Sequence, residues 1–315
     1  MTRRRRSRRT NLTLVTALLA LGGVSLLWGR TSQVRALPKE IASDTSVEAS
    51  PSRQAPRHAE KRASTTPERS ASASVGQSIH VALGVPTDSD PSDDYILDHG
   101  VYVLSYNHKK NVANWVAWEL DRAFLGHVRR KNDFRPDALL PADFYHVTAQ
   151  DYRKSGFDRG HLCPSADREA TLEDNSLTFL MTNIQPQLHE LNEGPWEKLE
   201  EHERELARRR DSEVFIVAGG IFDADYQRIG HEVAVPRANF KIIVTLRQGQ
   251  GASDVKFESK LVAVIIPNAP GVGSHPWTDY LTSVDAIEKA TGYDFLSNVP
   301  KAVQDVIEAK VASME

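Results

Sequence analysis

The feature that most constrains the fold of this 315-residue chain is a sharp change in composition near residue 76. Between residues 31 and 76 the chain is rich in Ser, Ala, Pro, Thr, Arg and Glu and has almost no large apolar or aromatic side chain. Such a segment cannot bury enough surface to offset the entropy lost on ordering, so residues 31–76 are predicted to be a disordered linker. The residues that could build a core follow it, and we expect one folded domain over residues 77–311.

The first 30 residues have the composition of a targeting segment. Six arginines within residues 3–9 precede an interrupted apolar run over residues 12–28. This pattern is typical of a cleaved export signal or of an uncleaved signal anchor, and both interpretations remain open. We therefore expect residues 1–30 to direct the protein out of the cytoplasm, so that it is periplasmic, secreted or membrane-anchored through residues 12–28. A mitochondrial presequence is the alternative, because no acidic residue precedes Glu40.

Charge is distributed unevenly along the chain. Of its 39 Lys and Arg residues and 42 Asp and Glu residues, 14 and 5 lie within residues 1–75. The remainder therefore carries 25 basic and 37 acidic residues, a net charge near −12. A domain of this charge lacks long-range attraction to a polyanion, so a partner of that kind would require a local basic patch together with divalent cations.

Hydrophobic patterning after residue 76 predicts several strands, with helices placed between them irregularly. Strands are expected over residues 101–105, 115–120, 179–182, 214–218, 241–246 and 261–266. Helices are expected over residues 195–210 and 285–291, and residues 172–178 are either helical or irregular. Pro195 suits the first turn of a helix, where its missing N–H costs nothing. Because strands and helices do not alternate, we expect an α+β domain around a mainly antiparallel central sheet with flanking helices.

Residues 157–162 place Asp158, Arg159 and His161 close together, a combination suited to phosphate chemistry. The ordinary pKa of imidazole lies near neutrality, so His161 could accept a proton from water. Arg159 precedes it by two residues, and in an extended chain both side chains point to one face. The guanidinium would bind a phosphate through two hydrogen bonds, unless it forms an ion pair with a neighbouring carboxylate. Asp158 is expected to orient the loop.

About thirty residues later the chain reads Leu-Asn-Glu-Gly-Pro-Trp over residues 191–196. Together with residues 157–162, this segment resembles the DNA/RNA non-specific endonuclease family, the ββα-metal nucleases that include the endonuclease G type. The resemblance covers about residues 102–295 and implies a ββα-metal active-site motif within the α+β fold. It also implies hydrolysis of phosphodiester bonds in DNA and RNA with Mg²⁺, or alternatively Mn²⁺, leaving 5′-phosphate ends. A homodimer remains an open alternative.

The resemblance assigns chemical roles to four residues that match the family's motifs. His161 matches the general base, and Arg159 matches the arginine that binds the scissile phosphate. Arg130 resembles an upstream arginine that also binds phosphate. Arg204, on the predicted helix, resembles an arginine that contacts the phosphate or stabilises its charge. Contacts of this kind carry no information about base sequence.

The metal site is implied by the same resemblance. Asn192 matches the single protein ligand of the cation, which is chemically sensible because Mg²⁺ usually keeps several waters. Glu200 matches a carboxylate that holds those waters, although with Arg204 it could equally form an ordinary i,i+4 ion pair on a solvated helix. Asn183 matches an asparagine that positions the metal-binding helix, and a turn-forming role is its alternative.

Several alternatives remain open at this stage. The upstream arginine could be Arg129 or Arg135 instead of Arg130. The single cysteine, Cys163, excludes an intrachain disulfide and lies two residues from His161, so a Cys/His hydrolase is conceivable, although no orienting partner is evident. A protein that binds or takes up nucleic acid without cleaving it, and a phosphodiesterase acting on another substrate, are the other functions that these residues allow.

Overall fold

The structure, a computed structural model, describes residues 75–313. The predicted targeting segment and nearly all of the predicted linker therefore lie outside the described residues. Val75 is already buried, with 4% of its surface exposed, and belongs to the core. Within residues 75–313 no helix combines the length and apolar character needed to cross a membrane.

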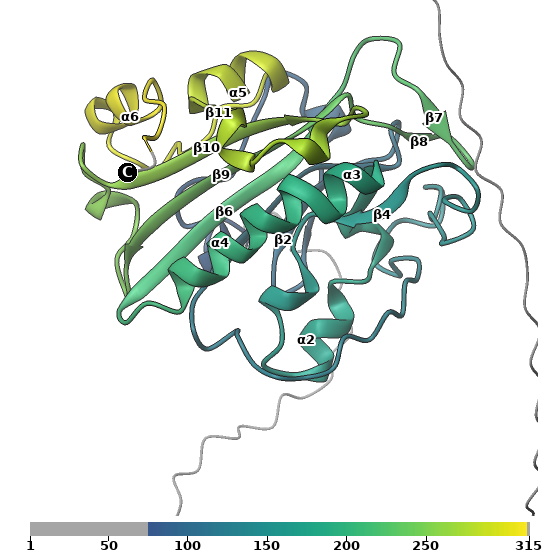
Figure 1. Cartoon of the computed structure of the whole chain (residues 1–315), viewed down its shortest axis with the longest axis horizontal. Coiled ribbons are helices and arrows are strands. Elements are labelled where there is room, and N and C mark those ends of the chain that lie inside the picture. Colours follow the sequence, from purple (N-terminus) through teal and green to yellow (C-terminus); the bar gives the residue numbers. More distant parts are fainter. Residues whose placement is uncertain (1–74, 314–315) are drawn as a thin grey trace, which may run out of the picture. The chain divides into compact units, whose positions relative to one another are not determined.

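A seven-stranded sheet forms the centre of the described domain, and every pair of neighbouring strands in it is antiparallel. In spatial order its strands are β1 (Tyr95–Asp98), β2 (Val103–Asn107), β3 (Val112–Leu120), β6 (Ser212–Ile221), β9 (Ala238–Arg247), β10 (Lys260–Pro267) and β11 (Leu281–Thr282). The helices lie against this sheet instead of alternating with its strands (Figure 1). The prediction of an α+β fold around an antiparallel sheet is confirmed.

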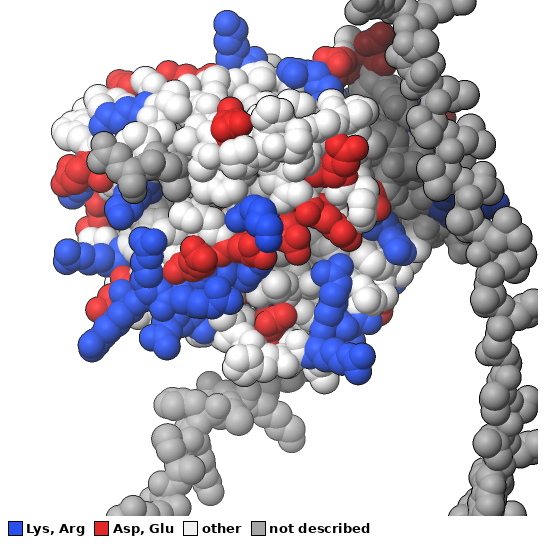
Figure 2. Space-filling model, in the orientation of Figure 1, with Lys and Arg blue, Asp and Glu red and all other residues white. Residues whose placement is uncertain are grey.

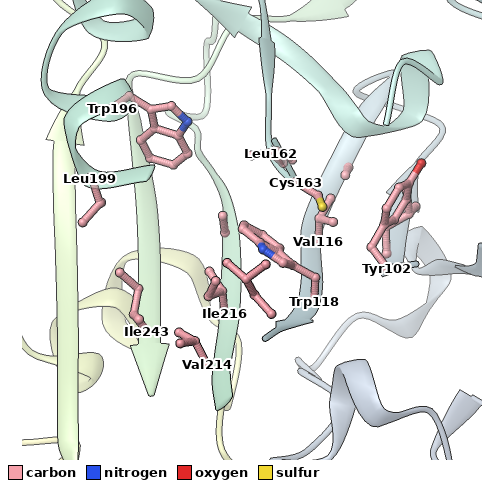
Figure 3. Close-up of a cluster of buried hydrophobic side chains, with 14 of the residues drawn as sticks. Tyr102, Val116, Trp118, Leu162, Cys163, Trp196, Leu199, Val214, Ile216 and Ile243 are labelled. Carbon is pink, nitrogen blue, oxygen red and sulfur yellow. The ribbon is translucent and has the colours of Figure 1, made fainter. Parts of the chain in front are cut away.

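The central strands are largely apolar because the sheet is covered on both faces. Successive side chains of a strand point to opposite faces, and in β3 the residues alternate between two buried clusters. Val116 and Trp118 belong to the cluster shown in Figure 3, where Trp196 and Leu199 lie over the strands. Trp115 belongs to the cluster on the opposite face. This two-sided burial explains why the runs at β6, β9 and β10 could be recognised from sequence.

One face of the sheet carries the helices that shape the candidate site, and the other carries the C-terminal helices. The helices are α2 (Leu172–Leu177), α3 (His189–Leu191), α4 (Glu197–Ala207), α5 (Val284–Thr291) and α6 (Lys301–Ile307). Short 3₁₀ turns lie at Ile79–Val81, Pro91–Asp93, Ser165–Asp167, Met181–Asn183, Ala252–Asp254, Val272–Ser274 and Trp277–Tyr280. Gly292 ends α5 with a φ of 86°, a conformation that glycine adopts without strain.

A buried ion pair fixes α4 to the sheet. Nζ of Lys241 on β9 lies 2.9 Å from Oε1 of Glu203 on α4, and both side chains are fully buried. The same ammonium lies 4.3 Å from the centroid of the Trp196 ring, so it also makes a cation–π contact. A buried charge is tolerated only when it is paired, and the pair therefore specifies where α4 sits on the strands.

A smaller ββα unit beside the sheet contains the residues of both sequence motifs. Strands β4 (Asp158–His161) and β5 (Ile184–Gln187) pair antiparallel, and α3 and α4 follow β5. A Cβ at Gly160 would lie 2.1 Å from Oε1 of Gln187 on the partner strand, so a larger residue there would have to displace that buried side chain. A separate hairpin is formed by β7 (Arg228–Ile229) and β8 (Val233–Ala234).

Two local predictions need correction. The strand predicted at residues 179–182 is wrong: a 3₁₀ turn occupies Met181–Asn183 and the strand begins only at Ile184. These residues are apolar because they cover the ββα unit, with Phe179 fully buried. The helix predicted over residues 195–210 begins at Glu197, because Gly194 (φ −113°, ψ −119°) interrupts the backbone inside a wide turn.

Candidate active site

A cavity of about 380 Å³ lies between the ββα unit and the neighbouring loops. Its wall includes six of the eight residues for which a role was predicted: Arg130, Arg159, His161, Asn192, Glu200 and Arg204. They come from a loop, from β4, from the wide turn after α3 and from α4, and span 75 positions of sequence. The fold therefore brings together side chains that only the motif resemblance had connected.

His161 lies at the back of this cavity with 7% of its surface exposed. The Phe179 ring meets it edge-on at 5.0 Å between centroids, and the Phe134 ring lies at 5.5 Å. Its Nε2 atom is buried and has no hydrogen-bond partner among the described residues. Burial, and then the positive charges of Arg130 and Arg159, lower the pKa of His161 to about 3. The imidazole is therefore neutral at ordinary pH and has a nitrogen free to accept a proton.

Two of the cavity's three arginines, Arg130 and Arg159, are held by contacts other than ion pairs. Arg159 is exposed, and its guanidinium stacks 4.2 Å from the centroid of the Phe134 ring. Within residues 75–313 it forms no ion pair, which disfavours the carboxylate-paired alternative. Arg130 donates from Nη1 to Oγ of Ser165 (2.9 Å), and its guanidinium lies over the Phe179 ring. Both cations are thus oriented while their charge remains available to an anion.

The geometry favours Arg130 as the upstream arginine. Arg130 lines both this cavity and an adjoining one of about 510 Å³, whereas neither Arg129 nor Arg135 lines either. Arg135 instead donates to the carboxylate of Asp133 at 3.0 Å and to the backbone oxygen of Ser176. The sequence could not distinguish three nearby arginines, because the choice depends on which one the loop turns inward.

Arg204 is oriented by a carboxylate that the sequence did not single out. Its Nη1 donates to Oδ1 of Asp167 at 3.2 Å, while Glu200 lies 4.0 Å away. Asp167 is fully buried and accepts a second hydrogen bond at Oδ2 from Nε1 of Trp118 (3.0 Å). The i,i+4 contact with Glu200 is thus the weaker of the two. No sequence signal could have identified Asp167, since its partners lie 37 and 49 positions away.

Asn192 presents an oxygen suited to a cation. Its Nδ2 donates to Oδ2 of Asp158 at 3.2 Å, and Nδ1 of His189 lies 2.9 Å from the same oxygen. The amide orientation is therefore fixed, and its Oδ1 faces no donor among the described residues. A hard cation that keeps most of its waters fits this single oxygen and the room of the cavity. Asp158 thus orients the Asn192 amide, whereas the sequence predicted that it orients the loop.

Glu200 lines the same cavity wall, and the residues around it shift the pKa of its carboxyl group. Burial, followed by the negative charge of Glu203, raises its pKa to about 8, while Lys241 and Arg204 act in the opposite direction. A cation near Glu200 would favour the ionised form. A second set of potential ligand atoms, from Asp158, His189 and Glu193, lines the adjoining cavity. A metal there would have to displace both hydrogen bonds to Asp158.

Asn183 does not line the cavity. Its fully buried side chain donates to the backbone oxygens of Cys163 (2.9 Å) and Thr178 (2.8 Å) and accepts from the backbone N–H of Cys163 (2.9 Å). It therefore fixes the chain immediately after β4, which carries His161. Cys163 is buried, burial raises the pKa of its thiol, and it lines neither cavity, so the structure offers no support for a Cys/His hydrolase.

The surface around the site carries charges of both signs. The adjoining cavity shares Arg130, Arg159, Asn192 and Glu193 with the first. Figure 2 shows blue and red side chains interleaved on this face, with an acidic band running across it. A polyanion would therefore meet positive charge locally, at the arginines of the cavity, and not over the whole face.

Known proteins are similar to this chain in sequence and in fold. Residues 82–302 match the family model described as DNA/RNA non-specific endonuclease. A nuclease of Nostoc sp. is 44% identical over 239 residues, which cover 74% of this chain and 86% of that protein. Human mitochondrial endonuclease G is 34% identical over 211 residues, covering 63% and 68%. A crystal structure of an EndoG/EndoGI complex matches with a TM-score of 0.61 at 25% identity, over 76% of this chain and 95% of that one.

Proposed function

Because the chain belongs to the DNA/RNA non-specific endonuclease family, we propose that its cavity hydrolyses phosphodiester bonds in both DNA and RNA, using a divalent cation and leaving 5′-phosphate ends. The observation that carries this proposal is a buried, neutral His161 on the same cavity wall as three arginines and the oriented amide of Asn192. Nuclease activity itself follows from the family, and the chemical details are the proposal.

His161 acts as the general base. The neutral imidazole, which lines the cavity, takes a proton from a water aligned with the P–O3′ bond. The new O–P bond forms as the P–O3′ bond breaks, and the departing 3′ oxygen takes a proton from solvent. Arg130 and Arg159 lower the pKa of His161. A bound phosphodiester offsets both charges, so substrate binding itself raises the basicity of the imidazole.

The three arginines hold the non-bridging oxygens of the phosphate. Arg159 and Arg130 approach from the β4 side, and Arg204 approaches from α4, where Asp167 fixes its direction. A guanidinium offers paired donors that match phosphate oxygens. All of these contacts are to the backbone of the nucleic acid, which accounts for activity without sequence preference and on both DNA and RNA.

Mg²⁺, with Mn²⁺ as the alternative, is the proposed cation. Asn192 would be its one protein ligand through Oδ1, and Glu200 would hold its waters. When bound, the ion supplies positive charge for the pentacovalent phosphorus and the leaving oxygen. The chain's own contribution is the orientation of the ligand amide by Asp158 and the placement of α4.

We further propose that residues 1–30 export the protein and that residues 31–76 tether a nuclease domain beginning near residue 77. Cleaved and membrane-anchored forms, through residues 12–28, both remain within this proposal. Mitochondrial delivery is the alternative, since relatives such as human endonuclease G are named as mitochondrial. Both monomer and homodimer are compatible with a cavity built from one chain.

The test is cleavage of supercoiled plasmid and of a structured RNA, each with Mg²⁺ and with EDTA, by the wild-type protein and by His161→Ala. His275→Ala, which alters an exposed histidine away from the cavity, is the matched control. We expect both substrates to be cut by the wild type and by the control only when Mg²⁺ is present. Plasmid retarded in a gel but never nicked would indicate a binding protein, and hydrolysis of a small phosphodiester alone would indicate another substrate.

A further inference from the structure

Three carboxylates gather on the face of the sheet opposite α4. Asp285 and Glu288 belong to α5, and Glu308 follows the last turn of α6. One carboxylate oxygen of each lies within 4.8 Å of those of the other two. The residues next to them, Val284 and Ile307, are part of the buried cluster on this face. The three negative charges are therefore held together by the packing of the two C-terminal helices, and not by loop geometry alone.

The carboxylate of Glu308 is not fully satisfied by the protein around it. Only 4% of its surface is exposed, and its Oε1 is buried without a hydrogen-bond partner among the described residues. Burial, followed by the negative charge of Glu288, raises its pKa to about 8. A buried carboxylate oxygen that accepts no hydrogen bond is costly, and a second carboxylate beside it increases that cost.

The surrounding protein charges do not compensate the cluster. Lys301 lies near enough to favour the ionised form of both glutamates, but its Nζ is bound at 2.6 Å to Asp305. Asp294 adds further negative charge nearby. Of the two remaining carboxylates, Glu288 accepts a single backbone N–H, from Phe295 at 3.0 Å. Either a proton or a cation must balance the charge.

We propose that Asp285, Glu288 and Glu308 bind a Ca²⁺ ion that joins α5 to the end of α6. All three donors are carboxylate oxygens, which hard cations prefer and which do not favour Zn²⁺. Ca²⁺–oxygen bonds of roughly 2.3–2.6 Å allow ligand atoms up to about 5 Å apart, whereas Mg²⁺ bonds of about 2.1 Å require a tighter arrangement. The three oxygens, no more than 4.8 Å apart, therefore lie within the span that Ca²⁺–oxygen bonds allow.

The ion would strengthen a contact between α5 and the end of α6 that a backbone hydrogen bond already makes. The N–H of Asp285 donates to the carbonyl of Glu308 at 3.1 Å, so the two segments are in register before any ion binds. Asp285 is exposed, which gives the ion an entry path and room for water ligands. Because this junction lies across the sheet from the cavity, its occupancy should change stability and leave the catalytic chemistry unaltered.

The test measures thermal unfolding and calorimetric Ca²⁺ binding of the full chain. Asn192→Ala serves as the background, because it removes the cation ligand proposed for catalysis. In that background we expect Tm to rise by about 5–10 °C at a Ca²⁺ concentration one hundred times Kd. Glu308→Gln and Asp285→Asn should each weaken Ca²⁺ binding at least tenfold and remove the rise in Tm. Glu173→Gln, which alters an exposed carboxylate of α2 outside this cluster, is the control and should retain both.

Two results would overturn the site. The first is an unchanged Tm with Ca²⁺, combined with a Glu308→Gln protein that is at least as stable as its parent, because the cluster would then share a proton instead of an ion. The second is Ca²⁺ binding that persists equally in Glu308→Gln and Asp285→Asn, which would place the ion elsewhere. Neither result bears on cleavage of nucleic acid, so this proposal and the proposed function can fail independently.

Discussion

The sheet side and the cavity side of α4 differ in whether the polar groups there have partners. Toward the sheet, Lys241 and Glu203 form a fully buried pair, closed by the Trp196 ring. Toward the cavity, Arg159 has no carboxylate partner among the described residues and His161 has a buried nitrogen without a hydrogen bond. Paired charges hold the helix in place, while unpaired ones remain for a substrate. Arg204 is the exception on the cavity side, because Asp167 pairs with its guanidinium and orients it.

The largest effect is expected from His161→Ala. Loss of a general base should lower kcat by roughly 10²–10⁴ while leaving nucleic-acid affinity nearly unchanged, because the arginines remain. Single-turnover cleavage and gel-shift titration measure the two quantities separately. Turnover within tenfold of the wild type would show that another group accepts the proton.

On the sheet side, Lys241→Met should destabilise the domain by about 3–5 kcal/mol, since it leaves the buried Glu203 carboxyl without its partner. Replacing both residues, Lys241→Met with Glu203→Leu, should recover most of that loss. Chemical denaturation of the single and double variants gives both values. Additive losses in the double variant would mean that the pair contributes through packing and not through charge compensation.

Asn192→Ala and Asp158→Ala should both raise the Mg²⁺ concentration needed for half-maximal rate, and Asn192→Ala should raise it more. Asn192→Ala removes the proposed ligand and should raise the Mg²⁺ concentration for half-maximal rate most strongly. Asp158→Ala only releases the amide and should raise it by roughly tenfold, with the maximal rate retained at saturating Mg²⁺. A Mg²⁺ titration of the cleavage rate measures both. If Asp158→Ala had the larger effect, Asp158 itself would be the ligand.

The smallest expected effect is a shift in the pKa of His161. The pKa of His161 is about 3 in the free protein, below its ordinary value of 6.5, so the ring should stay neutral as pH falls from 7 to about 4. Arg130→Gln removes one of the positive charges that lower the pKa, so the pKa should rise, although burial keeps it below 6.5. NMR titration of the His161 ring protons follows this directly. An identical titration in the variant would mean that the charge of Arg130 does not contribute to the pKa of His161.

The sequence predicted the parts of the site that follow local rules. Arg159 and His161 share a face because they are two residues apart on a strand, and the apolar runs of β6, β9 and β10 reflect burial on both sides. Contacts between segments that are far apart along the chain could not be predicted from the sequence. Asp167 gains its role from Arg204, and both partners of the buried ion pair belong to residue types that usually lie at the surface.

Gly194 separates the proposed ligand from the helix that is fixed to the sheet. Asn192 lies before the interruption and Glu200 lies after it, so no continuous helix dictates their separation. The turn that carries Asn192 packs instead against the loop before β11, where a Cβ on Gly194 would approach Cα of Gly273 to 3.3 Å. During evolution, substitutions in that loop could therefore change the geometry of the proposed cation site without altering the Lys241–Glu203 ion pair that fixes α4 to the sheet. An engineer seeking altered metal preference would accordingly vary residues 271–274 before any residue of α4.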